Sequence, residues 1–374
     1  MVGTYGVASA QLYWGRIAAI LIRILYAFFP QIDWGFVYVD DFALLIRSKW
    51  AALVGWTAMV LLTVLGCPFS WHKVSLALRN TWLGISIRPS PPLALLPEEK
   101  LTLMVGYMND LIQGTFHTHN HIQSMLGRLV WATQVCPHAK PFLQPLFAWK
   151  AMAHKGAYPG PRQKMMAALI RTFIRHPFTP PHPRPTPTAF SGASDASAAQ
   201  SGRVGIGGWL SDSPTSKWDV WWYAAEINPR LFPAFFEDPT KPPSQHIAAW
   251  ELLGSMYLFK YILAMVPQNH LHEVYVPGVT DNQGNTYSIL NLKTKVWPAA
   301  AFVMELAWFT HKTGAQVGIV HKKRTLNTWA DALAGGDHRG FDPGKRIPCQ
   351  PCPDDWDLLP SILQSDPGSG KHGT

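Results

Sequence analysis

The first residues whose types could do chemistry are two adjacent carboxylates. Asp40 and Asp41 separate the apolar run Phe36–Val39 from the run Phe42–Ile46, a pattern typical of strand, tight turn and strand. Because side chains alternate across a strand, neighbouring acids reach a common ligand only at such a turn. Like charges that close repel unless a cation lies between them, so the pair is a candidate divalent-metal site. The alternative is a surface hairpin with two solvated carboxylates.

A second set of acids follows in the other half of the chain. Asp195 comes after an expected strand, and Asp281 ends the expected strand Val274–Thr280, at the edge where α/β sites form. Glu251 lies on an apolar helix face, where a carboxylate costs free energy unless it is paired or metal-bound. Asp331 lies in a short helix near the end of the series. Any one of these acids could be structural, but together they run strand-Asp, helix-Glu, strand-end-Asp, helix-Asp.

Other clusters indicate less. His117, His119 and His121 alternate without a carboxylate nearby, which favours an exposed loop over a metal site. Cys349 and Cys352 have no second pair that would complete a zinc site. With four Cys in the sequence and no disulfide framework, we expect a reducing, intracellular compartment. We find no signal peptide.

Charge and hydropathy limit the class of protein. The 374 residues suffice for two or three domains, and 32 Lys and Arg against 23 Asp and Glu give a net charge of +9. That excess favours a polyanionic partner. The apolar run Ile17–Phe29 is interrupted by Arg23, and Ala51–Leu65 is shorter than the roughly 20 residues that cross a bilayer. We therefore expect two buried helices and no membrane span.

Spacing and punctuation predict the elements that position these residues. A helix begins near Ser9 and ends at Pro30, and Ser48 and Gly66 bound a second. Four helices with recurring Lys and Arg are expected at 98–112, 120–135, 141–153 and 163–175, which suits an element lying along a duplex backbone. A Pro-rich connector follows at 176–187. In the second half we expect strands at 188–194, 218–223, 274–280 and 317–321, and helices from Ser244 and Asn327. The Gly-rich segment 202–210 fits close packing within a strand.

The first ninety residues resemble reverse transcriptases of retroelements. Tyr38–Asp41 looks like the metal-binding turn of that family. The segment Tyr5–Arg16 before it, and the string Pro68–Lys73 and the hairpin Trp82–Gly84 after it, resemble further motifs of the family. Tyr5 and Gln11 depart from the family pattern, which has Phe and Pro there. The resemblance implies metal ligands at Asp40 and Asp41, a charge neutraliser or proton donor near the leaving pyrophosphate at Lys73, and contacts to template, nucleotide or primer from Gly6, Ser9, Arg16, Trp82 and Gly84.

From about Thr188 to Leu333 the chain resembles ribonuclease H domains of retrotransposon polyproteins. The strings Ser194–Ser197, Glu251–Leu253, Thr280–Asn282 and Asn327–Leu333 carry the likeness, and the last two favour DIRS-like or Gypsy-like elements. The resemblance implies two Mg²⁺ ions (Mn²⁺ is possible) that hydrolyse RNA in an RNA–DNA hybrid. The implied ligands are Asp195, Glu251, Asp281 and Asp331, with phosphate contacts from Lys322, Lys323 and Arg324. His321 is a candidate aid to product release.

The sequence also departs from both families. The interval between Asp195 and Glu251 is long, and its Pro-rich filler from Pro229 to Pro243 predicts a loop insertion. The polymerase family uses a third carboxylate and a fingers region that precede the first motif, and we expect both to be missing here. Asp33 cannot replace that carboxylate, because seven residues along a strand place it about 23 Å from the turn.

The fold class predicted from these observations combines two architectures. We expect an α+β partial reverse-transcriptase palm, a helical thumb or connection, and an α/β ribonuclease H-like domain whose mixed central sheet is flanked by helices. The expected ranges are palm 1–90, thumb or connection 91–175, linker 176–187, ribonuclease H-like domain 188–335 and a poorly ordered tail 336–374. Expected partners are an RNA–DNA hybrid, template RNA, primer DNA and the rest of the polyprotein. The alternative is a catalytically inactive nucleic-acid-binding remnant of a decayed element.

We predict that the full chain does not extend a DNA primer on an RNA template. A two-metal site lacking one of three ligands should be slower by several orders of magnitude, because the metals supply most of the charge stabilisation. The measurement is extension of a labelled primer by purified protein in Mg²⁺. Extension by the natural sequence that Asp40→Asn abolishes would contradict the prediction.

Overall fold

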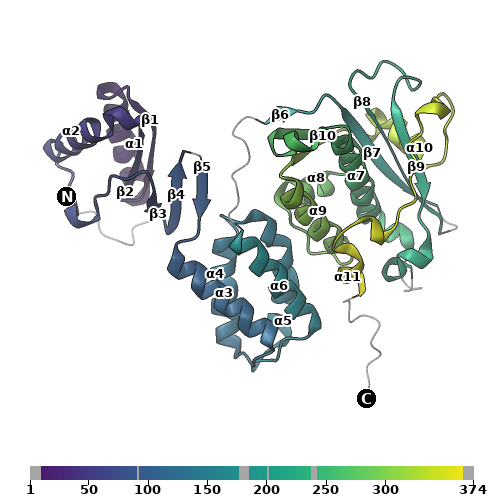
Figure 1. The fold of residues 1–374 in the computed structure, drawn as a ribbon, viewed down its shortest axis with the longest axis horizontal. Coiled ribbons are helices and arrows are strands. Elements are labelled where there is room, and N and C mark those ends of the chain that lie inside the picture. The colour runs from purple at the N-terminus through teal and green to yellow at the C-terminus, as the bar shows by residue number, and fades with distance from the viewer. Residues whose placement is uncertain (1–9, 91, 177–184, 200–201, 237–241, 365–374) are drawn as a thin grey trace. The chain divides into compact units, whose positions relative to one another are not determined.

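The computed structural model describes residues 10–90, 92–176, 185–199, 202–236 and 242–364 (Figure 1). Gly6 and Ser9, expected near template and nucleotide, lie outside the described residues. The chain divides into two compact units, Met1–Pro97 and Glu98–Thr374. Each unit is described by itself below.

The first unit is built on two short sheets and two helices. Helix α1 (Ala10–Phe28) ends before Pro30, as its sequence predicts, and strands β1 (Ile32–Tyr38) and β2 (Asp41–Ile46) form an antiparallel hairpin in which Tyr38 faces Asp41. The predicted strand, turn and strand are therefore confirmed. Helix α2 follows, and then a three-stranded antiparallel sheet; their bounds are α2 Ala51–Val64, β3 Asn80–Trp82, β4 Ile85–Pro89 and β5 Pro92–Leu95.

The prediction that both apolar helices of this unit are buried is wrong. Each buries one stripe at helical spacing: Leu21 and Leu25 in α1, and Ala58 and Leu62 in α2. A two-stranded hairpin offers too little surface to cover more than one stripe of each helix. The other faces leave large apolar side chains exposed, namely Leu12, Tyr13, Ile17, Ile20, Leu53, Trp56, Val60 and Val64.

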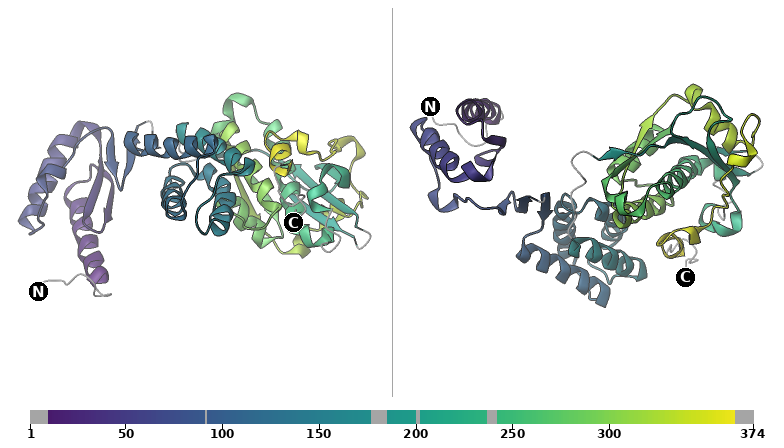
Figure 2. Two further views of the ribbon diagram at one scale, coloured as in Figure 1. Left: turned by 90° about the horizontal axis from the view of Figure 1, so that it is seen from below. Right: turned by 45° about the horizontal axis from the view of Figure 1, so that its top comes forward.

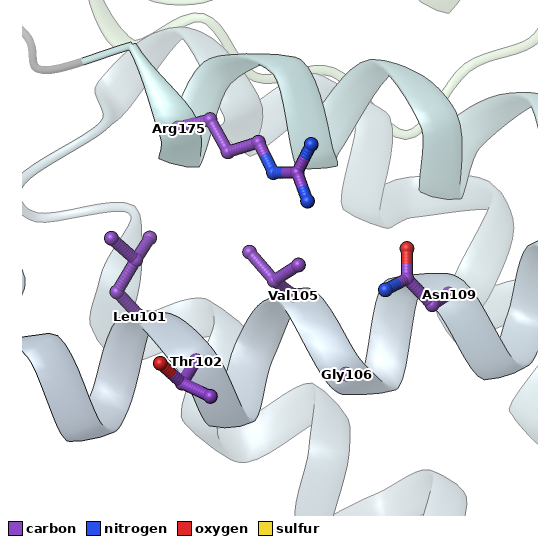
Figure 3. A pocket seen from close by; sticks show the side chains of 6 residues that line it. All are labelled: Leu101, Thr102, Val105, Gly106, Asn109 and Arg175. Atoms are coloured by element: carbon purple, nitrogen blue, oxygen red, sulfur yellow. The ribbon is translucent and has the colours of Figure 1, made fainter.

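The second unit begins with the four predicted helices. Their bounds are α3 Glu98–Gln113, α4 His119–Ala132, α5 Gln144–Met152 and α6 Pro161–Arg175, with a 3₁₀ segment at Pro137–Leu143 before α5. Thr118 caps α4 through its side chain, and Pro161 occupies the first turn of α6. Helices α3 and α6 pack on each other, and between them lies a groove of about 380 Å³ into which Arg175 points (Figure 3).

These helices share a core with the rest of the second unit. The ring of Phe173 on α6 lies 4.8 Å from the ring of His311, and Arg162 stacks over Trp297 at 4.0 Å. His138 joins this contact, and burial lowers the pKa of its imidazole to about 4. The Pro-rich stretch predicted as a domain boundary therefore joins two parts that pack together (Figure 2).

The remaining elements form an α/β layer structure. The strands are β6 Thr186–Pro187, β7 Ser191–Ala198, β8 Val204–Ser211, β9 Trp221–Glu226, β10 Val274–Thr280 and β11 Gln316–His321. The helices are α7 Ile247–Ala264, α8 Gln283–Asn291, α9 Ala299–Thr313, α10 Thr328–Ala334 and α11 Leu359–Gln364. The sheet order is β11-β10-β7-β8-β9, with β6 beside β10. Strands β7 to β9 are antiparallel neighbours, while β10 runs parallel to β7 and β11, so the sheet is mixed, as the sequence predicts.

Helices α7 and α10 cover opposite faces of the central strands. Ile206 of β8 faces Gly254 of α7, whereas its neighbours Gly205 and Gly207 face α10, as the alternation of a strand requires. A Cβ atom on Gly207 would lie 2.4 Å from the backbone nitrogen of Ala334. The Gly-rich segment thus lets α10 approach the sheet at backbone distance, which fits the close packing predicted from the sequence.

Among the described residues, one helical segment is long and apolar enough to cross a membrane, Pro243–Ala264. It contains α7, whose side chains from Ala249 to Phe259 are buried against the sheet and α9. Its apolar composition is therefore that of a core helix.

The prediction of a poorly ordered tail from residue 336 is wrong as far as residue 364. Trp356, Leu359 and Ile362 are buried, and the backbone N–H groups of Leu358 and Leu359 each donate to Glu305 of α9 at 2.7 Å. Prolines and glycines shape this segment into short turns, while widely spaced apolar residues anchor it on α7 and α9. The many prolines and glycines led to the prediction of disorder, although a few buried apolar residues hold the segment in place.

We predict that Gly207→Ala destabilises the second unit by about 1–3 kcal/mol, because the added methyl group overlaps the backbone of α10. The measurement is urea unfolding followed by circular dichroism. Gly127→Ala is the matched control, since a Cβ there meets nothing within 4 Å on helix α4, and it should be neutral or stabilising by up to about 1 kcal/mol. Equal effects of the two substitutions would refute the close approach of α10.

Candidate metal centre

The strand register brings two of the predicted acids together. Strands β7 and β10 are parallel neighbours, with Ala193 beside Val279. Two residues further on, Asp195 and Asp281 occupy equivalent places, and neighbouring strands lie about 4.8 Å apart. Asp281 stands just past the end of β10, whereas Asp195 is inside β7, because that strand runs to Ala198 and not to the predicted Ser194.

Helix α7 adds the third acid. It crosses β7 closely: the hydroxyl groups of Ser194 and Ser255 lie 3.0 Å apart. Glu251 precedes Ser255 by one helical turn, and Ser255 donates to its backbone oxygen at 3.0 Å. One carboxylate oxygen each from Asp195, Glu251 and Asp281 lie within 4.8 Å of one another. This is the one group of three or more potential metal ligands among the residues that the structure describes.

The electrostatics of this triad favour a bound cation. Burial, assisted by the charges of Asp281 and other acids, raises the pKa of Asp195 to about 7, and burial likewise raises the pKa of Glu251 to about 7. Asp195 is 3% exposed, and its Oδ2 atom is buried without a hydrogen-bond partner. A buried carboxylate oxygen beside two others is the hard oxygen donor set that Mg²⁺ and Mn²⁺ prefer.

Two asparagines orient Glu251. The side-chain nitrogen of Asn285 donates to Oε2 of Glu251 at 3.2 Å and to the backbone oxygen of Ala248 at 2.8 Å. Asn282 caps α8 by accepting from the backbone N–H of Asn285 at 3.0 Å, and it also hydrogen-bonds Glu251. The turn after β10 thus supplies both Asp281 and the groups that hold Glu251. The sequence analysis did not identify Asn285 as a partner of Glu251. Its position three residues after Asn282, the N-cap of α8, was the available signal that it lies in the first turn of that helix.

The fourth predicted acid lies beside the triad but outside it. Asn327 anchors the start of α10 by donating to the backbone oxygen of Ser194 at 3.3 Å, and Asp331 follows one turn later. The carboxylate of Asp331 accepts from Arg324 at 2.8 Å. Asp331 is close enough to raise the pKa of Asp195. The pairing of Arg324 with an acid, where a phosphate contact was predicted, was also not evident from the sequence.

The other predicted residues of this region are exposed. Lys322 and Lys323 follow β11 with their side chains in solvent. The backbone N–H of Lys322 donates to the backbone oxygen of Thr280, the residue before Asp281, at 2.9 Å. His321 hydrogen-bonds the backbone oxygen of Asp281 at 3.0 Å through Nε2. The basic segment therefore begins directly beside the triad.

In the first unit, two of the predicted polymerase residues lie at the β1–β2 turn. Asp40 and Asp41 are exposed at that turn, and no third potential ligand of the described residues forms a group with them. Asp33 lies at the far end of β1, where it pairs with Arg47 at 3.1 Å. Lys73 is exposed in a 3₁₀ turn. The metal-ligand role of the two carboxylates stays a prediction.

Two contacts connect the motifs of the first unit. Trp14 of α1 donates a hydrogen bond to the backbone oxygen of Val39, which has a φ of 55°, a rare value for a β-branched residue. The ring of Trp82 lies 5.9 Å from the ring of Phe36. The predicted Trp82–Gly84 hairpin is confirmed, with Leu83 and Gly84 both at positive φ, as a two-residue turn of this kind requires. Arg16 is exposed on α1.

No family model matches the sequence, and no curated protein does. Solved structures that match this chain include a foamy viral protease-reverse transcriptase (the form named dRH) in complex with double-stranded DNA, at 14% identity and a TM-score of 0.37. The match covers 84% of this chain and 49% of that chain. The foamy viral protease-reverse transcriptase in complex with an RNA/DNA hybrid is similar at 13% identity and a TM-score of 0.40, covering 86% and 39%.

Ribonuclease H1 from the halophilic archaeon Halobacterium salinarum NRC-1 is similar at 13% identity and a TM-score of 0.29. That comparison covers 40% of this chain and 96% of the archaeal protein. This chain spans less than half the length of the foamy viral proteins. All three likenesses are at 13–14% identity, with TM-scores from 0.29 to 0.40.

We predict that Asp195→Asn stabilises the metal-free second unit at pH 8 by about 2–4 kcal/mol. The folded-state pKa of Asp195 is raised, so the unfolded chain ionises first and stability falls as pH rises from about 4 to about 7. Below pH 4 both states are protonated, and the difference should vanish. The measurement is urea unfolding in EDTA across this range, with the exposed Asp212→Asn as control. A mutant no more stable than the natural protein at pH 8 would contradict the prediction.

Proposed function

We propose that this chain is part of a retrotransposon reverse transcriptase and ribonuclease H polyprotein, and that residues 188–335 hydrolyse RNA in RNA–DNA hybrids. The observation that carries the proposal is the carboxylate triad: one oxygen each from Asp195, Glu251 and Asp281 lie within 4.8 Å of one another. They come from a strand, a helix and a strand end. Asp331 lies beside them. The strings around Asp281 and Asp331 support a DIRS-like or Gypsy-like element. RNA-directed DNA polymerase activity belongs to the full-length element in this proposal.

The four carboxylates would hold two Mg²⁺ or Mn²⁺ ions. When bound, such ions lower the pKa of a coordinated water and stabilise the leaving 3′ oxygen. The chain itself keeps Asp195 buried, so its charge acts at low screening. Asn285 fixes the direction in which Glu251 presents its second oxygen. Lys322 and Lys323, exposed next to the triad, would bind phosphates of the hybrid.

The net charge supports a nucleic-acid partner. Across the chain 32 Lys and Arg exceed 23 acids, even though the centre itself gathers several carboxylates. In the helical segment, Arg175 points into the groove between α3 and α6 (Figure 3). Template RNA and primer DNA are the partners that the resemblance of the first unit adds to the proposal, with the rest of the polyprotein.

We predict that the full chain in Mg²⁺ cleaves a labelled RNA strand annealed to DNA, and that Asp281→Asn slows cleavage by about 10²-fold or more, because a preorganised charge is lost. Asp212→Asn is the control: it removes an exposed acid of the same unit and should leave the rate unchanged. Gel separation of the labelled products measures all three rates.

The second candidate function is a catalytically inactive remnant that binds nucleic acid. The exposed apolar faces of α1 and α2 favour it for the first unit, because such surfaces promote aggregation. A folded chain that binds the hybrid but does not cleave it in Mg²⁺ or Mn²⁺ would support the remnant and overturn the nuclease.

A further inference from the structure

Of the four acids of the candidate centre, Asp331 has a cationic partner. The guanidinium of Arg324 lies 2.8 Å from Oδ1 of Asp331, while one oxygen each from the other three acids gather in the triad. The charge of Arg324 also acts on Asp195, Glu251 and Asp281. One side chain thus supplies positive charge at the edge of the whole centre.

The contact between Arg324 and Asp331 can be replaced by a contact between Arg324 and a phosphate. Arg324 lies in a 3₁₀ turn (Arg324–Leu326) between β11 and α10, and its side chain is 75% exposed against 42% for Asp331. Pairs exposed to this degree contribute little to stability. A guanidinium binds a phosphate in the same two-pronged way as a carboxylate. A nucleic-acid backbone arriving beside Lys322 and Lys323 therefore offers Arg324 an alternative partner at little loss.

We propose that Arg324 withholds Asp331 from a metal ion until a nucleic-acid phosphate draws the guanidinium away. Without nucleic acid the triad can take one divalent ion, while the carboxylate that would complete a second site is neutralised by Arg324. When a phosphate takes Arg324, Asp331 becomes available and the centre regains a negative charge that favours a second cation. Substrate binding and loading of the second ion are thereby coupled. This inference rests on the proposed nuclease function.

The test measures ion binding apart from cleavage. Mn²⁺ is titrated into the full chain, and free Mn²⁺ is followed by electron paramagnetic resonance. We expect one ion to bind the natural protein and a second to bind weakly. In Arg324→Gln the second ion should bind about 3-fold to 10-fold more tightly, because a competing cation is removed from Asp331. Arg203→Gln is the matched control, since it breaks an exposed ion pair with Glu226 elsewhere in the same unit, and should leave Mn²⁺ binding unchanged.

A second arm uses the ligand. A hybrid whose RNA strand carries 2′-O-methyl groups resists cleavage, and it should tighten the second ion in the natural protein but add little in Arg324→Gln. Equal tightening by Arg203→Gln, or two ions of equal affinity in the natural protein without nucleic acid, would overturn the gate and leave the nuclease standing. If Asp281→Asn left Mn²⁺ binding unchanged, or if the natural protein bound no Mn²⁺, the proposed function itself would be overturned.

Discussion

Holding three carboxylates within 4.8 Å of one another opposes folding, because each charge is repelled by its neighbours and Asp195 is shielded from water. The surrounding structure is organised to tolerate this. Two parallel strands fix the positions of Asp195 and Asp281, and a long buried helix fixes Glu251. The side chains need no further adjustment to face one another. The repulsion lowers the stability of the fold at this point of the sheet, and a bound cation would offset it.

Small residues are the second requirement. The hydroxyl groups of Ser194 and Ser255 let α7 lie close to β7 on one face, and Gly205 and Gly207 let α10 lie on β8 on the other. Larger side chains at these places would push the layers apart and carry Glu251 and Asp331 away from the strands. The polar centre therefore depends on residues that have no chemistry of their own.

The sequence predicted those features that depend on local pattern. The hairpin at Asp40 and Asp41, the four helices after residue 98, and the element type under each of the four later acids follow from spacing and turn residues. Features that depend on side-chain contacts were missed. Asn285 supports Glu251, 34 residues earlier, only because α8 and α7 meet in the fold. The pairing of Arg324 with Asp331 is local, but it depends on how the turn before α10 directs the guanidinium. The burial of the helices in the first unit was overestimated because an apolar composition does not reveal how much partner surface exists.

The segment from Phe341 to Ile362 has a consequence for how the protein is made. Glu305 is 1% exposed, and its carboxylate is satisfied by backbone groups more than fifty residues later, at Leu358 and Leu359. During synthesis the helix that carries Glu305 leaves the ribosome well before those partners do. Until the segment from Phe341 to Ile362 has been synthesised, the carboxylate of Glu305 lacks these hydrogen-bond donors, and the surface that Trp356 covers stays exposed. The last turns of the described chain are thus needed before the second unit can close its core.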